Sequence, residues 1–137
     1  MKKLILIAIL SMAGFAQAQN VKLTVEMAGF GSNDGKAKVG LYNSESNFLK
    51  TPIKSMVVAI KDGKAKAIFE GLEKGEYAVS IYHDKNGNGV LDKNMMGIPS
   101  EPYASSNGAK GFMGPPAYSD AKFAIQSNSI VKININN

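Results

Sequence analysis

The sequence contains no cysteine and only one histidine. Without cysteine the chain can form neither a disulfide nor a thiolate nucleophile, so an exported form must be held together by packing, with or without a metal ion. A single histidine excludes a histidine pair for zinc, and no serine lies in a glycine elbow. These absences argue against hydrolytic and zinc-dependent mechanisms, and we predict a protein that is not an enzyme.

Long apolar runs are also scarce. The clearest one, residues 4–10, follows two lysines and precedes a small-x-small pattern at residues 16–18. The run is too short for a membrane anchor, which needs about 20 apolar residues. We therefore expect a signal peptide over residues 1–18, cleaved after Ala18, and an exported mature chain of residues 19–137 that is periplasmic or secreted. With no later apolar run and no cysteine, we expect neither a transmembrane segment nor a lipid anchor.

Clusters of charge are missing as well. The formal net charge is +5, which becomes about +3 once the two lysines of the signal peptide are removed. The lysines are spread over the predicted strands, and there is no arginine–aromatic patch. This distribution indicates a solvated basic surface and predicts no nucleic-acid partner.

Apolar residues alternate with polar ones in short segments, and turn-forming residues separate the segments. No segment carries an apolar stripe of helical period, and Asp62-Gly63 is a strong two-residue hairpin signal. We therefore predict an all-β fold: one antiparallel immunoglobulin- or transthyretin-like β-sandwich of about seven strands. The predicted strands are residues 21–27, 36–42, 56–60, 64–70, 77–81, 121–125 and 131–135.

A long insertion, residues 84–120, interrupts this rhythm. Connections longer than about 15 residues without regular structure are either functional or disordered. The insertion contains too much apolar area to remain in water, so we expect an ordered excursion over one end of the sandwich. Most of its apolar side chains are predicted to form a satellite core. Tyr103 and Tyr118 are candidate contacts for a glycan or peptide, because tyrosine combines a flat apolar ring with a polar tip.

The first residues of the insertion place oxygen-bearing side chains at every second position. Calcium loops of the EF-hand type use side-chain oxygens at positions one, three, five and nine, a carbonyl at seven and glycine at six. Counted from Asp84, the chain matches this pattern and fails at position twelve, where Met95 replaces a bidentate glutamate. Glu101 or Asp120 is a candidate for the missing acid. The predicted calcium ligands are Asp84, Asn86, Asn88, Asp92 and the carbonyl of Val90.

Two alternatives stay open for this loop. Its Asn-Gly pairs are strong turn formers, so the loop could be a metal-free turn within a glycan- or peptide-binding module. His83 and Asp84 could belong to a small hydrolase, but no nucleophile accompanies them. We predict a non-catalytic module with calcium as its cofactor and a glycan or peptide of the envelope or extracellular space as its partner.

A series of motifs in order along the chain carries a resemblance. The chain resembles the secreted bacterial family catalogued as domain of unknown function 2141, over nearly the whole mature chain. This resemblance implies an exported, single-domain β-sandwich of a Gram-negative bacterium, and it supplies no activity or binding residues. The motifs are residues 71–79, 83–92 (HDKNGNGVLD), 97–103 (GIPSEPY), 106–107, 114–116 and 120–123.

Overall fold

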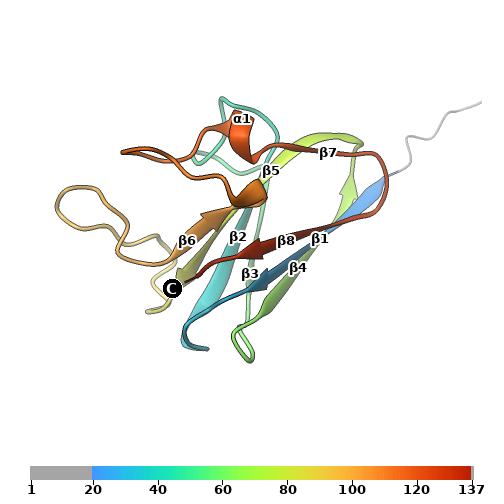
Figure 1. Cartoon of the computed structure of the whole chain (residues 1–137). Coiled ribbons are helices and arrows are strands. Elements are labelled where there is room, and N and C mark those ends of the chain that lie inside the picture. Colours follow the sequence, from blue (N-terminus) through green and yellow to red (C-terminus); the bar gives the residue numbers. More distant parts are fainter. Residues whose placement is uncertain (1–19, 137) are drawn as a thin grey trace, which may run out of the picture.

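The computed structural model describes residues 20–136, and the predicted signal peptide lies outside this range. Two β-sheets pack face to face (Figure 1). Within residues 20–136, no helix has the length and apolar character needed to cross a bilayer. The elements are β1 (Val21–Ala28), β2 (Lys36–Tyr42), β3 (Lys54–Val58), β4 (Ala65–Leu72), β5 (Gly75–Asp84), β6 (Tyr103–Ser105), the 3-10 turn η1 (Ser106–Gly108), α1 (Tyr118–Ala121), β7 (Phe123–Ile125) and β8 (Ser129–Asn134).

The strand order confirms an all-β sandwich. One sheet has the order β4-β1-β8, and the other has the order β3-β2-β5-β6, with β7 also paired to β5. All strand pairs are antiparallel except β1 with β8, which is parallel. The described part of the chain contains eight strands instead of about seven, because β6 forms within the insertion. A three-residue strand is too short for alternation to reveal it in the sequence.

The core lies between the two sheets and follows from the period-two pattern. In β1, Leu23 and Val25 are fully buried while Thr24 between them faces outward. Burying each such side chain contributes about 1.5–3 kcal/mol to stability. Among the described residues, the core extends from Val21 to Ile135, so a chain that starts at residue 19 contains all of these core residues. Its other fully buried members include Ala37, Val39, Leu41, Ala67, Val79 and Ile81.

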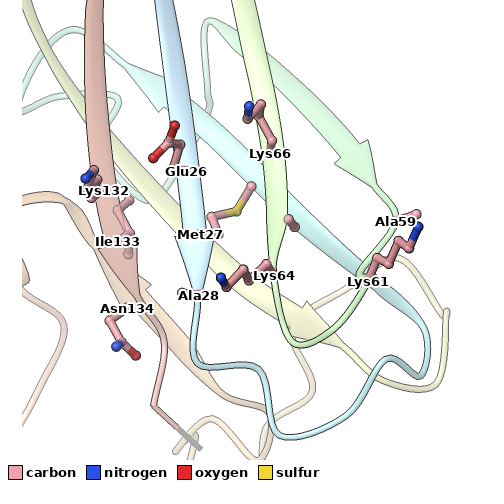
Figure 2. A pocket seen from close by; sticks show the side chains of 11 residues that line it. Glu26, Met27, Ala28, Ala59, Lys61, Lys64, Lys66, Lys132, Ile133 and Asn134 are labelled. Carbon is pink, nitrogen blue, oxygen red and sulfur yellow. The ribbon is translucent and has the colours of Figure 1, made fainter.

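The outer face of the three-stranded sheet is basic and contains an open groove of about 680 Å³ (Figure 2). Glu26 lies between Lys66 and Lys132, its cross-strand neighbours in β4 and β8. Lys61 and Lys64, from the hairpin before β4, line the same groove. Four lysines therefore gather at one face, contrary to the scattered distribution expected from the sequence. Their charge opposes edge-to-edge pairing with another sheet.

The insertion follows the edge of the five-stranded sheet (Figure 1). It leaves β5 at Asp84 and returns along β5 as β6, and β7, which follows the insertion, pairs with the start of β5. The prediction of an excursion over one end of the sandwich is therefore wrong. The backbone edge of β5 requires hydrogen-bond partners, and the insertion supplies them. Ala121, predicted to lie in a strand, belongs to α1.

Ser106 in η1 fastens the insertion to the sheet. Its side chain is fully buried. The hydroxyl donates to the carbonyl of Ala121 at 2.6 Å and accepts the N–H of Val79 at 3.0 Å. One hydroxyl thus satisfies a backbone acceptor beside α1 and a backbone donor in β5, which locates the return of the insertion against the sheet.

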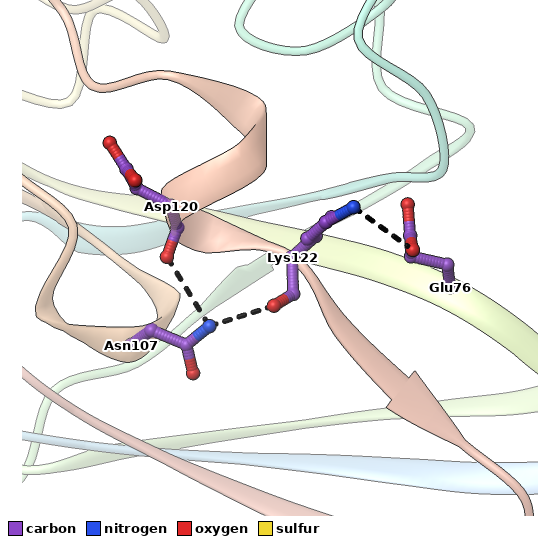
Figure 3. Close-up of polar contacts among 4 residues, drawn as sticks. All are labelled: Glu76, Asn107, Asp120 and Lys122. Carbon is purple, nitrogen blue, oxygen red and sulfur yellow. Dashed lines mark hydrogen bonds and ion pairs between the residues drawn. The ribbon is translucent and has the colours of Figure 1, made fainter.

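Asn107, the next residue, secures the same junction from the surface (Figure 3). Its side-chain amide donates to the carbonyls of Asp120 at 3.3 Å and Lys122 at 2.8 Å. Asn107 has a positive φ of 60°, a conformation that asparagine adopts more readily than most residues. The ammonium of Lys122 lies 3.6 Å from the carboxylate of Glu76 in β5, which adds an exposed ion pair.

The predicted satellite core forms only in part. A small cluster on the outer face of the five-stranded sheet contains Tyr118 from the insertion and Ala121 just after it, packed with Tyr42, Phe48 and Ala78. The prediction is wrong for the large apolar side chains on the turns of the insertion, which are exposed: Met95, Met96, Ile98, Phe112 and Met113. Tyr103, which was predicted as a surface contact, is exposed on β6.

Candidate metal centre

Asp84 stands at the end of β5, where the insertion begins. Its side chain is only 3% exposed. Oδ2 accepts the N–H of Gly89 at 2.8 Å, which closes the loop from its first position to its sixth. Oδ1 is buried and has no hydrogen-bond partner among the described residues. An unpaired buried carboxylate oxygen is costly, so this atom is available to a cation.

The other predicted side-chain ligands meet around Asp92. The Oδ1 atoms of Asn86 and Asn88 accept the N–H groups of Asn88 and Val90, each at 3.1 Å. Each amide oxygen keeps a second lone pair. The Nδ2 groups of the two asparagines donate to the two carboxylate oxygens of Asp92, at 2.5 and 2.6 Å. The structure thus brings three of the four predicted side chains into mutual contact, and the backbone of Val90 into contact with one of them.

Glu101 is the further acid that reaches this loop. Its carboxylate is buried and bridges two backbone N–H groups, those of Lys85 at 3.1 Å and Asp92 at 3.2 Å. Glu101 therefore closes the loop across its base. Asp120, the other candidate, lies in α1 and is exposed, where its carbonyl contacts Asn107. Sequence spacing could not show whether Glu101 or Asp120 reaches the loop, because this depends on the path of the insertion.

Two side chains of the five-stranded sheet support the loop from its flank. The ammonium of Lys38 and the hydroxyl of Tyr82 both donate to the carbonyl of Gly89, at 2.7 and 3.0 Å. Lys38 also places a positive charge beside the loop. Within residues 20–136, no group of three or more histidine, cysteine or acidic side chains has the arrangement of a metal site. A cation here would depend on a mixed set of carboxylates, amides and a carbonyl.

Comparison with known proteins identifies the family. The model of the family described as "Uncharacterized protein conserved in bacteria", domain of unknown function 2141, matches residues 25–133. The chain belongs to this family. No curated protein and no solved structure matches it. The matched range contains every proposed calcium ligand and the whole insertion, so the resemblance seen in the motifs is confirmed for this part of the chain.

In this family member, His83 is a buried part of the scaffold. Its side chain is 0% exposed and its ring packs edge-on against Phe30, with centroids 5.3 Å apart. Nε2 lies 2.7 Å from the carbonyl of Asp34, which can only accept, so Nε2 carries the proton. His83 therefore ties β5 to the connection between β1 and β2, and a substrate has no access to it.

The two predicted ligand-binding tyrosines of the family member lie in different surroundings. Tyr118 is buried in the small outer cluster, 5.7 Å from Phe48 between ring centroids, so it is not a surface contact. Tyr103 is 46% exposed and pairs with Tyr82 across β5 and β6. Tyr82 was not predicted from the sequence as a member of this surface. Its place between Ile81 and His83 in an alternating strand indicated an outward side chain. Its pairing with Tyr103 could not be predicted, because it requires β6 to lie beside β5.

The phenol of Tyr118 makes stability depend on alkaline pH. Burial, with a contribution from the nearby Glu76 carboxylate, raises the pKa of Tyr118 to about 12. Because the folded state has the higher pKa, this contribution is complete below pH 10 and is lost as pH rises through about 12. We expect Tyr118→Phe to flatten the fall in unfolding free energy between pH 10 and 12, measured by urea titration against the unaltered chain. Parallel pH profiles for the two proteins would contradict this prediction.

Proposed function

We propose that this protein is an exported, non-catalytic β-sandwich module whose Asp84–Asp92 loop binds calcium. The observation that carries the proposal is the buried Oδ1 of Asp84, which has no hydrogen-bond partner among the described residues. A predicted signal peptide supports export to the periplasm or the medium. The burial of His83, the only histidine, supports a role without catalysis.

The donor set suits a hard cation. Asp84 and Asp92 supply carboxylates, Asn86 and Asn88 supply amide oxygens, and Val90 supplies a carbonyl. Calcium accepts six to eight such oxygens in flexible geometry, with water completing the set, whereas magnesium demands a stricter octahedron. The loop has no soft ligand. With two carboxylates as ligands and Lys38 beside the loop, we expect a Kd of about 0.1–1 mM, in the range of extracellular calcium modules.

Calcium in this loop would stiffen the segment that follows it. Asp84 ends β5, whereas Asp92 begins a hairpin in which Ser100 donates to the carbonyl of Asp92 at 2.8 Å. An ion bound by both carboxylates would link this hairpin to the sheet. The proposed role of the ion is therefore to fix the part of the insertion that the module presents to a partner.

The replacement Asp84→Asn tests the proposal directly. Asparagine keeps the shape of the side chain and an oxygen for the N–H of Gly89, while it removes one ligand charge. We expect the calcium affinity measured by isothermal titration calorimetry to fall about tenfold or more, since ligand charge sets the affinity of such loops.

Asp62→Asn is the matched control. Asp62 occupies a hairpin turn between β3 and β4 with φ of 53°, a conformation that asparagine also adopts. Asp62→Asn removes one carboxylate charge at a position distant in sequence from the loop, so it should leave the calcium affinity unchanged. Equal affinities in the unaltered chain and Asp84→Asn, or no calcium binding by the unaltered chain, would refute the metal site.

One observation favours a second candidate, a metal-free glycan- or peptide-binding module. Lys38, Tyr82 and Tyr103 are direct neighbours across β2, β5 and β6, and therefore share one face of the sheet. An aromatic pair beside a cation is typical of surfaces that contact sugars and peptides. Loss of glycan-array binding in Tyr103→Ala, with calcium absent throughout, would favour this candidate; an unaltered chain that binds no array component would exclude its glycan form.

A further inference from the structure

Two projecting turns of the insertion present the most exposed large apolar side chains among the described residues. The Met95 tip (residues 93–99) exposes Met95 and Met96 by 105% and 84%, and the Phe112 tip (residues 110–116) exposes Phe112 and Met113 by 94% and 93%. Both turns extend from the same side of the sandwich, at the left of Figure 1. Apolar residues exposed on the sheets reach at most 61%. Exposed apolar groups gathered in this way mark an interaction surface.

We propose that the two tips dock this protein onto a lipid bilayer that carries anionic headgroups. The apolar side chains would enter the boundary between headgroups and acyl chains, and flanking lysines would contact the headgroups. This inference goes beyond the proposed calcium module and does not depend on calcium binding, because the Met95 tip has its own hydrogen bonds.

Several backbone groups of the Met95 tip are already paired, which lowers the cost of entering a lipid interface. Asn94 accepts the N–H groups of Met96 and Ile98 through its side-chain oxygen, at 2.9 and 3.0 Å. Its carbonyl accepts the N–H of Gly97 at 3.0 Å, and its own N–H donates to the carbonyl of Ile98 at 2.9 Å. Three consecutive N–H groups at this turn therefore need no water, and the two methionines are exposed by an ordered turn.

The Phe112 tip is also a tight turn. A Cβ at Gly111 would lie 1.9 Å from the carbonyl oxygen of Gly114, so the chain closes on itself between these glycines. Met113 within the turn has a positive φ of 55°. This conformation costs about 1–2 kcal/mol for a residue with a side chain. Its side chain is nevertheless 93% exposed and is therefore available to an apolar environment outside the protein.

Charge complementarity selects an anionic lipid surface as the occupant. Lys93 and Lys110 are both exposed, and neither tip contains an acidic residue. Each cation therefore lies within three residues of an exposed apolar pair, the combination that anionic interfaces attract. The apolar side chains are carried by two separate projecting turns, a shape that suits insertion into a soft interface more than contact with a flat protein surface.

Vesicle co-sedimentation tests the proposal. The chain from residue 19, without its apolar leader, would be mixed with phosphatidylcholine vesicles containing about 30% phosphatidylglycerol, in EDTA and in calcium. We expect binding in both, with about tenfold weaker partitioning for Met95→Ser/Met96→Ser and for Phe112→Ser/Met113→Ser, because each pair removes two inserted apolar groups. Lys93→Gln should weaken binding about fivefold, and about 0.5 M salt should have a similar effect.

Val57→Ser and Ile130→Ser are the matched controls, since each removes an exposed apolar side chain from a strand, at 59% and 61% exposure. Neither should alter partitioning. The proposal fails if the unaltered chain stays in the supernatant at every lipid concentration, or if a control weakens binding as much as a tip variant does. It also fails if the tip substitutions abolish only self-association, measured by light scattering. Binding in EDTA together with a failed calcium titration would leave this inference standing and remove the calcium module alone.

Discussion

Replacing Gly35 by alanine is expected to lower the free energy of unfolding by about 4 kcal/mol, as the sum of two effects. Gly35 has a φ of 67°, where a side chain costs about 1–2 kcal/mol. A Cβ at this position would also lie 1.9 Å from the backbone carbonyl oxygen of Asp84. Because backbone cannot rotate away as a flexible side chain can, β5 must shift at Asp84, the first residue of the proposed calcium loop. Urea unfolding gives the stability, and calorimetry should show weakened calcium binding.

Gly71→Ala separates these two effects. Gly71 has a φ of 68°, almost the same as Gly35, but a Cβ there would meet no atom within 4 Å. Gly71→Ala should therefore lower the free energy of unfolding only by the cost of a side chain at positive φ, about 1–2 kcal/mol, and leave calcium binding unchanged. If both alanine variants lose the same stability, the close contact between Gly35 and Asp84 does not constrain the loop.

Replacing Ser106 by alanine should cost about 3 kcal/mol, because it leaves two buried backbone groups without partners. These are the N–H of Val79 and the carbonyl of Ala121, which the Ser106 hydroxyl bridges. The cavity of a lost hydroxyl is too small to account for this figure. We expect a lower midpoint in urea and faster proteolysis within residues 107–117, since this hydroxyl helps to fix the return of the insertion.

Ser105→Ala is the control for this change. Ser105 is also buried, at 3% exposure, but its hydroxyl is not part of the bridge. A loss of less than about 1 kcal/mol is expected there. Equal losses at the two serines would mean that burial of a hydroxyl, and not the bridge, explains the effect.

The sandwich was predictable because alternation records which side of a strand is buried. The strand β1 buries every second residue, so its place in the sheet is visible in sequence. The parallel pairing of β1 with β8 was not predictable, because alternation carries no information on neighbours or direction. The strand β6 could not be predicted for a related reason. Its three residues form a strand because they pair with β5, and their sequence alone shows no strand pattern.

Residue spacing selected Asp84 and Asp92 as proposed ligands, and the contacts among the side chains around Asp92 follow from local turns. The contacts that support this loop from other parts of the chain could not be predicted from the sequence. The contribution of Glu101 depends on the path of the insertion, which returns this carboxylate to the N–H groups of Lys85 and Asp92. The methionines and Phe112 were predicted to be buried, but they are exposed. Composition shows that a segment is apolar, and it does not show which side chains face inward.

The most direct test of the calcium loop is thermal unfolding of the chain from residue 19 in EDTA, in calcium and in magnesium. At about 10 mM calcium, roughly tenfold above the weakest expected Kd of about 1 mM, binding to the folded state alone adds at least about 1.4 kcal/mol. For a domain of this size the midpoint should rise by about 4–6 °C in calcium. Magnesium should produce a much smaller rise. Identical midpoints in EDTA and calcium would contradict the proposed metal site and leave the Asp84–Asp92 loop as a hydrogen-bonded turn.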